Sequence, residues 1–276
     1  MTRKILTILL TLTLLLVTVG AISAQEGQSI TVIPGGQTVE GALSGSSTAM
    51  LFAFNAAAGD TVTVNLGLPE TTTFDPIMLV VGPAGQVAAA TDSTATVDVE
   101  FSGSYFVVVS TTDSIDGTQV GQSPEEFDTP QPFLVSVSGN NPPPQAGTNL
   151  AYFRSPLEDG TSFEGYSSPS EPVYFFVFDG SAGETVDLIM TSSEIDSLMM
   201  IFDATGNMVG SNDDTQGIAL PGAGDSAIEG LRLPDDGTYL VFATDVTYPT
   251  IPARDADEEN ELELFEGGDF VITLVR

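Results

Sequence analysis

Oxygen-bearing side chains that suit a metal ion gather in one stretch of the second half of the chain. They are Asp196, Asp203, Asn212, Asp213, Asp214 and Asp225. A calcium ion takes about six to eight oxygen ligands, and carboxylates among them offset its charge. Asp203 ends one expected strand, and residues 212–214 follow the next strand of the same hairpin, so we expect these side chains to meet at one end of a sheet. The sequence therefore predicts a calcium site in this half.

The first half of the chain offers a comparison, because it repeats the same segment with different side chains. Three of the ligand positions hold Gly82, Thr91 and Ser93, and only Asp75 and Asp92 keep an acid. We therefore expect the second half to bind calcium more tightly than the first. The alternative is that the Asn-Asp-Asp run is a turn closed by Asx-type hydrogen bonds to the backbone.

The composition excludes several kinds of chemistry. The chain has 38 acidic and 6 basic residues, a formal net charge of −32, and neither histidine nor cysteine. Without these two residue types there is no Ser-His-Asp triad, no imidazole or thiolate metal ligand and no disulfide. A surface this acidic repels nucleic acid and anionic lipid, so neither is expected as a partner.

A hydrolase that uses carboxylates alone, such as a glycosidase, is a further alternative. A glycosidase needs two of them on opposite sides of the scissile bond, about 5 to 9 Å apart, and adjacent acids in a turn do not give that arrangement. The chain also lacks tryptophan. Tyr105 and Tyr239 are expected to pack within the fold. A sugar-binding face would therefore depend on other tyrosines, such as Tyr152, Tyr166, Tyr174 and Tyr248.

Residues 1–24 have the form of a secretory signal peptide. Arg3 and Lys4 precede an apolar run from residue 5 to residue 19, and small residues follow to Ala24. The run is short for a membrane span and no basic stop-transfer flank follows it. We expect export with cleavage near Ala24, no membrane insertion afterwards, and a secreted or cell-surface location.

The chain contains an internal duplication. The repeating unit is roughly 110 to 125 residues long, which is the size of a whole β-sandwich and larger than a solenoid repeat. We therefore expect two copies of one domain, each with its own apolar interior. The matching segments are 74–93 with 195–214, 51–66 with 174–189, and 102–110 with 236–244.

The apolar periodicity is that of strands, and no stretch has a helical period. Residues 173–178 are apolar on both faces, which predicts a central strand covered on each side, and residues 51–54 are their weaker counterpart. The expected strands lie near 29–33, 37–43, 49–55, 60–68, 76–81, 86–90, 96–101, 104–110 and 132–138, then near 162–166, 172–178, 184–190, 197–202, 207–211, 227–232, 238–244 and 269–275.

The domain boundaries follow from this pattern. We expect a first β-sandwich over residues 28–139, a proline-rich linker over 140–149 and a second β-sandwich over 150–276. Two insertions, 113–131 and 246–268, precede the last strand of each copy. The second insertion contains the acidic run 255–261, which indicates a solvated loop.

The order of these motifs resembles the bacterial pre-peptidase C-terminal (PPC) domain. In both copies a strand, AGD or AGE, another strand, a hairpin with a central glycine and a GSY or GTY strand follow one another. The resemblance implies an all-β protein of two tandem jelly-roll-like β-sandwich domains. It also implies a secreted, non-catalytic binding or structural module, with calcium and an extracellular polysaccharide or protein as partners. The alternative is a carbohydrate-binding or cell-wall-associated accessory protein that uses the loops of the second domain.

Overall fold

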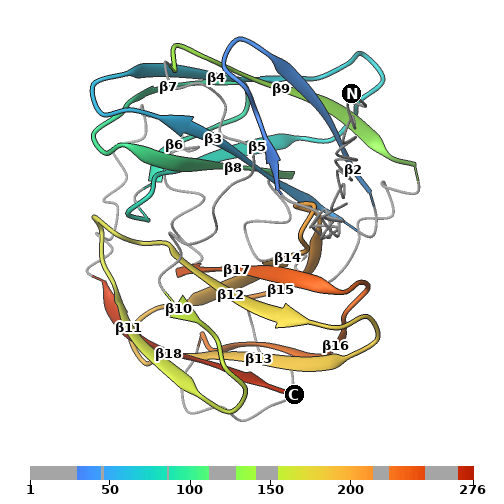
Figure 1. Cartoon of the computed structure of the whole chain (residues 1–276), viewed down its shortest axis with the longest axis vertical. Coiled ribbons are helices and arrows are strands. Elements are labelled where there is room, and N and C mark those ends of the chain that lie inside the picture. The colour runs from blue at the N-terminus through green and yellow to red at the C-terminus, as the bar shows by residue number, and fades with distance from the viewer. Residues whose placement is uncertain are drawn as a thin grey trace, which may run out of the picture.

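The protein is an all-β, sandwich-like structure, as the sequence predicts. The computed structural model describes residues 30–44, 47–85, 87–111, 129–140, 155–213, 224–245 and 267–276, and within these ranges it contains strands and no helix. The strands form four sheets. Figure 1 shows the four sheets stacked as layers, with the strands between residues 31 and 138 in the upper two and the strands between residues 155 and 275 in the lower two.

The first sandwich is built from residues 31–138. Its inner sheet has the strand order β1-β3-β8-β5-β6 and its outer sheet the order β2-β9-β4-β7. The strands are β1 (Thr31–Val32), β2 (Thr38–Leu43), β3 (Ala49–Ala56), β4 (Thr61–Gly67), β5 (Pro76–Val81), β6 (Val87–Thr91), β7 (Thr94–Asp98), β8 (Gly103–Thr111) and β9 (Gln131–Ser138).

The second sandwich repeats this topology strand for strand. Its inner sheet has the order β10-β12-β17-β14-β15 and its outer sheet the order β11-β18-β13-β16. The strands are β10 (Ser155–Pro156), β11 (Ser162–Ser167), β12 (Tyr174–Gly180), β13 (Thr185–Thr191), β14 (Ser197–Phe202), β15 (Met208–Asn212), β16 (Ser226–Arg232), β17 (Gly237–Asp245) and β18 (Gly268–Val275).

Strand pairing corrects the sequence alignment of the two halves by one residue. Leu51 pairs with Val108 in the first sandwich, and Phe175 pairs with Phe242 in the second. Because Val108 and Phe242 occupy the same place in their repeats, Leu51 corresponds to Phe175 and not to Tyr174. A one-residue shift moves a strand's side chains to the opposite face, so this correction decides which residues face which core.

Each sandwich has its own apolar core, as expected. Phe52, Phe54 and Phe133 are among the buried side chains of the first core, and Phe176, Phe178 and Phe270 are among those of the second. The outer strands supply the alternating apolar positions, and their other faces are more exposed. In β4 and β13, for example, every second residue is buried.

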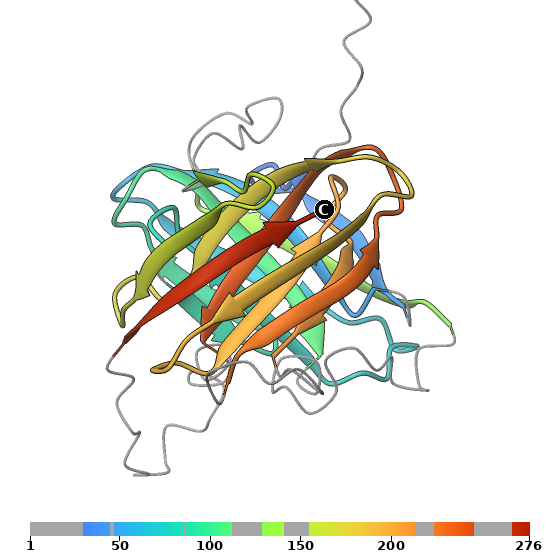
Figure 2. The ribbon, with the colours of Figure 1, turned by 90° about the horizontal axis from the view of Figure 1, so that it is seen from below.

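A third apolar core joins the two sandwiches. The inner strands send their remaining side chains toward each other, so that Leu51, Phe106 and Val108 meet Phe175, Met200 and Phe242. The ring centres of Phe106 and Phe175 lie 4.7 Å apart. Seen from below the second sandwich in Figure 2, the strands of the two halves cross obliquely. The central inner strands β3, β5, β8, β12, β14 and β17 are apolar on both faces because each of them covers two cores.

Reciprocal contacts between hairpin turns and strands supplement the third core. The backbone N–H of Leu51 donates to the carbonyl of Gly206 (2.8 Å), and that of Val173 donates to the carbonyl of Gly85 (3.2 Å). Gly85 and Gly206 lie in equivalent turns, and both have positive φ. A Cβ at Gly206 would also collide with the carbonyl oxygen of Leu51. Glycine is needed there both for the turn and for the close approach.

Two further features recur in both sandwiches and help to specify the fold. Gly41 of β2 and Gly165 of β11 lie where a Cβ would collide with a core phenylalanine ring. The buried Tyr105 and Tyr239 donate their hydroxyls to the carbonyls four residues upstream, at 3.1 and 2.7 Å. The prediction that these tyrosines pack within the fold is therefore correct, and each holds a loop against the end of an inner strand.

The expected strands agree with the observed ones apart from small differences in their ends. The two-residue strand β10 is the one described strand that the apolar pattern did not predict. The predicted signal peptide, the predicted linker after residue 140 and most of the two predicted insertions lie outside the described residues. The predictions for those segments, and the domain boundaries drawn through them, stay predictions.

Candidate functional site

Four of the six predicted metal ligands lie at one end of the second sandwich, around the start of β14. In this sheet, Ser197 pairs with Asp245 and Met199 pairs with Asn212, so the ends of β15 and β17 lie beside the start of β14. Asp213 and Asp225 are 9% and 1% exposed. The side chains that gather at this end, which we call the polar rim, are those of Asp196, Asn212, Asp213, Asp225 and Asp245.

Hydrogen bonds to backbone groups engage several side chains of the polar rim. Asp225 accepts the N–H of Ser192 (2.7 Å), and Asp245 accepts that of Asp196 (3.2 Å). The amide oxygen of Asn212 accepts the N–H of Ala227 (3.2 Å). These bonds satisfy backbone donors at strand ends and connect successive loops, which is what buried carboxylates of a structural network do.

Buried serine hydroxyls extend the polar rim into the sheet. Ser197 donates its hydroxyl to the carbonyl of Gly224 (2.7 Å), and its Oγ lies 2.9 Å from that of Ser226. Both serines are fully buried. In the first sandwich, the pair equivalent to Ser197 and Asp245 is Pro76 and Thr111. The carboxylate of this pair is therefore a feature of the second sandwich, and the shared fold does not require it.

Asp203 lies away from the polar rim, which corrects the expectation that it would meet residues 212–214. It follows β14 at the hairpin turn, whereas Asn212 lies at the far end of β15, opposite Met199. At about 3.3 Å per residue, the two are roughly 13 Å apart along the strand. The Asp203 carboxylate accepts hydrogen bonds from both the backbone and the side chains of Thr205 and Asn207. It closes an Asx-type turn.

The described residues do not assemble a metal centre by themselves. Within the described ranges, no group of three or more acidic side chains lies close enough to hold a metal ion. Asp214 lies outside those ranges, so the predicted six-residue set is not completely described. Calcium binding therefore stays a prediction of the sequence, restricted now to the polar rim.

The tyrosines proposed as sugar platforms have different environments. Tyr166 is 49% exposed on β11, where a sugar could reach its ring. Tyr174 is 6% exposed and donates its hydroxyl to the Tyr166 carbonyl (2.7 Å), so its ring belongs to the core and the prediction for it is wrong. Tyr152 and Tyr248 lie outside the described residues.

A pocket of about 410 Å³ lies elsewhere on the second sandwich, beside the short strand β10. We call it the Arg276 pocket. Its apolar part comes from Leu157, Val177 and Phe178, and the side chains of Leu157 and Phe178 are almost completely buried. The remaining lining residues are Pro156, Glu158, Asp159, Asp179 and Arg276. The parallel pairing of β10 with β12 places these segments side by side.

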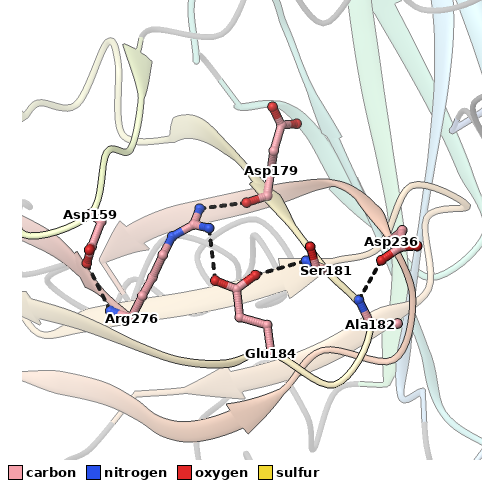
Figure 3. Close-up of polar contacts among 7 residues, drawn as sticks. All are labelled: Asp159, Asp179, Ser181, Ala182, Glu184, Asp236 and Arg276. Atoms are coloured by element: carbon pink, nitrogen blue, oxygen red, sulfur yellow. Dashed lines mark hydrogen bonds and ion pairs between the residues drawn. The ribbon is translucent and has the colours of Figure 1, made fainter.

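Arg276 is held firmly at the edge of this pocket (Figure 3). Its guanidinium forms an ion pair with Glu184 (2.9 Å) and donates to the carbonyl of Asp179 (2.6 Å). Its backbone N–H donates to the carboxylate of Asp159 (3.0 Å). The guanidinium carbon lies 5.9 Å from the centre of the Phe178 ring, within the range of a cation–π contact.

Glu184 and Asp236 fix the turn beneath Arg276. Glu184 accepts the backbone N–H of Ser181 (2.9 Å) with its second carboxylate oxygen, and Asp236 accepts that of Ala182 (2.8 Å), as Figure 3 shows. Glu184 therefore binds Arg276 and closes the turn with the same carboxylate. This arrangement pre-positions the guanidinium without any contribution from a ligand.

In the first sandwich, a neutral side chain caps the equivalent backbone carbonyl at this end. There the amide of Asn140 donates to the carbonyl of Asn55 (3.0 Å), which is equivalent to the Asp179 carbonyl that Arg276 caps. The Arg276 pocket has no local signature in the sequence because its residues come from three separate segments. The available signal was the rarity of basic residues: within the described ranges, Arg232 and Arg276 are the two basic side chains.

Together the fold and these sites define an all-β double sandwich with a partly buried polar rim and a small, mostly apolar pocket on its second half. Within the described residues, no helix is long and apolar enough to cross a membrane. No protein-family model matches the chain, and no curated protein matches it.

Comparison with solved structures gives weak similarities. One is to the PPC domain of a collagenase from Bacillus anthracis, with a TM-score of 0.31 and 9% identity over 49% of this chain and 99% of that one. Another is to a periplasmic inhibitor of g-type lysozyme from Aeromonas hydrophila, with a TM-score of 0.29 and 18% identity over 40% of this chain and 98% of that one. Membership of the PPC family stays a proposal.

Proposed function

We propose that this protein is an exported, non-catalytic binding or structural module made of two fused PPC-like sandwiches. The observation that carries the proposal is the third core, because it joins the two sandwiches through their inner sheets. The outer sheets and the strand ends remain as the surfaces that can meet other molecules. Such a body suits the display of binding surfaces at fixed spacing.

The chemistry of the side chains supports a non-catalytic role. The whole sequence lacks histidine and cysteine, so no imidazole or thiolate is present to act as a catalytic base or nucleophile. Asp225 and Asp245 accept hydrogen bonds from backbone N–H groups of neighbouring loops, and Asp203 accepts them within its own turn. A glycosidase instead needs two carboxylates that face a substrate across the scissile bond.

A carbohydrate-binding or cell-wall-associated accessory protein is the second candidate. The observation that favours it is that β15 and β17 end at the polar rim, immediately before residues 214–223 and 246–266. The two longest insertions of the second half therefore begin at one end of the sandwich. Their shared starting point supports a single binding surface there.

Export is tested first. The full chain is expressed in a bacterial host, and the secreted or envelope fraction is collected. N-terminal sequencing is expected to find a new N-terminus near Ala24. Retention of the first 24 residues on a cytoplasmic product would contradict the exported part of the proposal.

Binding and catalysis are tested on the mature protein. It is applied to insoluble polysaccharides, a glycan array and fibrous proteins, and each polymer is also assayed for hydrolysis. We expect binding without turnover, and deletion of residues 246–268 should abolish it if the second candidate is correct. Hydrolysis that is lost in Asp213→Asn would overturn the non-catalytic assignment.

A further inference from the structure

We propose that the Arg276 pocket binds a lysine or arginine side chain of a basic partner segment. This inference rests on the proposed binding role and adds to it the chemical class of one ligand. It concerns the end of the second sandwich that carries β10, not the polar rim. Three properties of the pocket favour such a ligand: its apolar floor, its acidic edge and the guanidinium that it already holds.

The floor of the pocket suits an aliphatic stem. Leu157 and Phe178 are 5% and 2% exposed, and they form an apolar surface beneath the opening. Lysine and arginine side chains bury their methylene groups on such surfaces while their charged ends stay in contact with water. A short anionic or purely polar ligand would leave this floor without a complementary group.

The edge of the pocket suits a cationic head. Glu158 and Asp159 line it with two carboxylates, whereas the charge of Arg276 is matched by Glu184. Asp179 meets Arg276 through its backbone carbonyl, because its carboxylate turns away and accepts the Thr238 hydroxyl (Figure 3). The local excess of negative charge is therefore two. The whole chain has a net charge of −32, which attracts basic partners over long distances at low salt. Charge complementarity selects a cation as the occupant.

Arg276 itself illustrates how a guanidinium is recognised at this surface. It lies over the Phe178 ring and is bound by a carboxylate and a backbone carbonyl. These are the groups that recognise cationic side chains in general: an aromatic face, an anion and a planar acceptor. A partner's side chain entering beside Arg276 would meet the remaining carboxylates and the rest of the floor.

The test uses a small cationic probe, because a long polycation would bind any protein this acidic. The probe is N-acetyl-Gly-Arg-Gly-amide, with the lysine peptide as a second cation and the neutral citrulline peptide as an isostere. The mature chain is titrated by two-dimensional ¹H–¹⁵N NMR at about 0.15 M salt, where distant charges are screened. Expected shifts centre on Leu157, Val177, Phe178 and Arg276 for both cations, and citrulline produces none.

Matched variants separate the pocket from general acidity. The double variant Glu158→Gln with Asp159→Asn removes two charges at the pocket, and Glu164→Gln with Glu229→Gln removes two exposed charges elsewhere. Two lost surface charge contacts are expected to weaken arginine-peptide binding about tenfold in the pocket variant, with no change in the control. In Asp159→Asn, the amide oxygen can still accept the N–H of Arg276, so the fold is kept.

Three results would overturn the inference: shifts dispersed over the acidic surface, equal weakening in the control variant, or equal binding of the citrulline peptide. None of these results affects the proposed module function, since polymer binding and the absence of turnover are measured separately. Conversely, hydrolytic turnover would overturn the non-catalytic proposal without affecting the assignment of the pocket.

Discussion

The strongest test of the double sandwich is the substitution Phe175→Ala in β12. Phe175 is 6% exposed and belongs to the third core. Its ring centre lies 4.7 Å from that of Phe106 in the first sandwich and 5.5 Å from that of Phe242 in its own. Truncation therefore removes contacts on both sides of the interface between the sandwiches.

The expected magnitude follows from the burial of this ring. A Phe→Ala change in a well-packed core costs about 3 to 5 kcal/mol, and the contact with Phe106 contributes about 0.5 to 1.5 kcal/mol through ring geometry. A typical domain has a free energy of unfolding of only about 5 to 15 kcal/mol. The third core would therefore lose a large part of the coupling that makes the two sandwiches unfold together.

The matched control is Phe270→Ala in the second core. Phe270 is 2% exposed and packs on Tyr174 at 4.9 Å, with no part in the third core. We expect both variants to lower the free energy of unfolding by similar amounts in urea. Only Phe175→Ala should split calorimetric unfolding into two transitions, because only that change weakens the contact between the halves.

Calorimetry gives the decisive comparison. The wild-type chain should unfold in one transition, with calorimetric and van't Hoff enthalpies that agree. If Phe175→Ala lowers the free energy of unfolding by less than about 1 kcal/mol, the ring contributes no more than an exposed side chain would. Splitting of the transition in Phe270→Ala as well would show that the halves are coupled by something other than the third core. Either result would refute the reasoning.

Three other predictions follow from individual side chains. Gly41→Ala should destabilise the protein by about 1 to 3 kcal/mol in urea, because its Cβ collides with a core ring, whereas Gly67→Ala, with 3.6 Å to its nearest neighbour, should be neutral or stabilising. Burial raises the pKa of the Tyr239 phenol above its ordinary 10.0. The stability that the phenol contributes is therefore complete below pH 10 and is lost as the pH rises through the raised value. Urea titrations at increasing pH and tyrosinate absorbance measure this loss, and a Tyr239 that ionises at the ordinary value in the native protein would contradict the prediction. Calcium should raise the melting temperature, and Asp225→Asn should reduce that rise while Asp203→Asn keeps it, because the Asp203 carboxylate is engaged by turn donors; no rise in the wild type would end the calcium prediction.

Strand positions were predictable because the apolar pattern of each strand records its burial. Residues 61–67 alternate between buried and less buried positions, and residues 197–202 are buried throughout, as their composition indicates. β10 escaped prediction because two residues ending in proline carry no period. The strand itself depends on pairing with β12, which is a tertiary contact.

The candidate site was harder to predict because it depends on which strand ends are neighbours. The order of the strands in the sequence predicted that Asp203 meets residues 212–214. In the antiparallel hairpin, however, Asp203 lies at the turn, and β15 ends at the opposite end of the hairpin, beside the start of β14. Asp245 joins the polar rim through pairing with Ser197, a partner 48 positions earlier in the chain. Such contacts have no local signature in a single sequence.

The inner strands that are apolar on both faces indicate contact between the two halves, which the sequence did not predict. Residues 173–178 were correctly predicted to need cover on both faces, and the structure shows that the second cover is the other half of the chain. In each sandwich, the inner sheet has a second apolar face that points away from the sandwich's own core. In the double sandwich, these two faces bury each other. The arrangement resembles an isologous dimer whose protomers are joined in one chain.

This duplication also separates what the fold needs from what it allows. Both halves keep the buried tyrosine, the glycine under a core ring and the closing carboxylate of the first turn, at Asp60 and Glu184. The halves differ at the ends of the sandwich: Pro76 and Thr111 against Ser197 and Asp245, and Asn140 against Arg276. Because the same fold forms with either set, selection for folding alone does not explain the charged set. The ends of the second sandwich are therefore where binding measurements should begin.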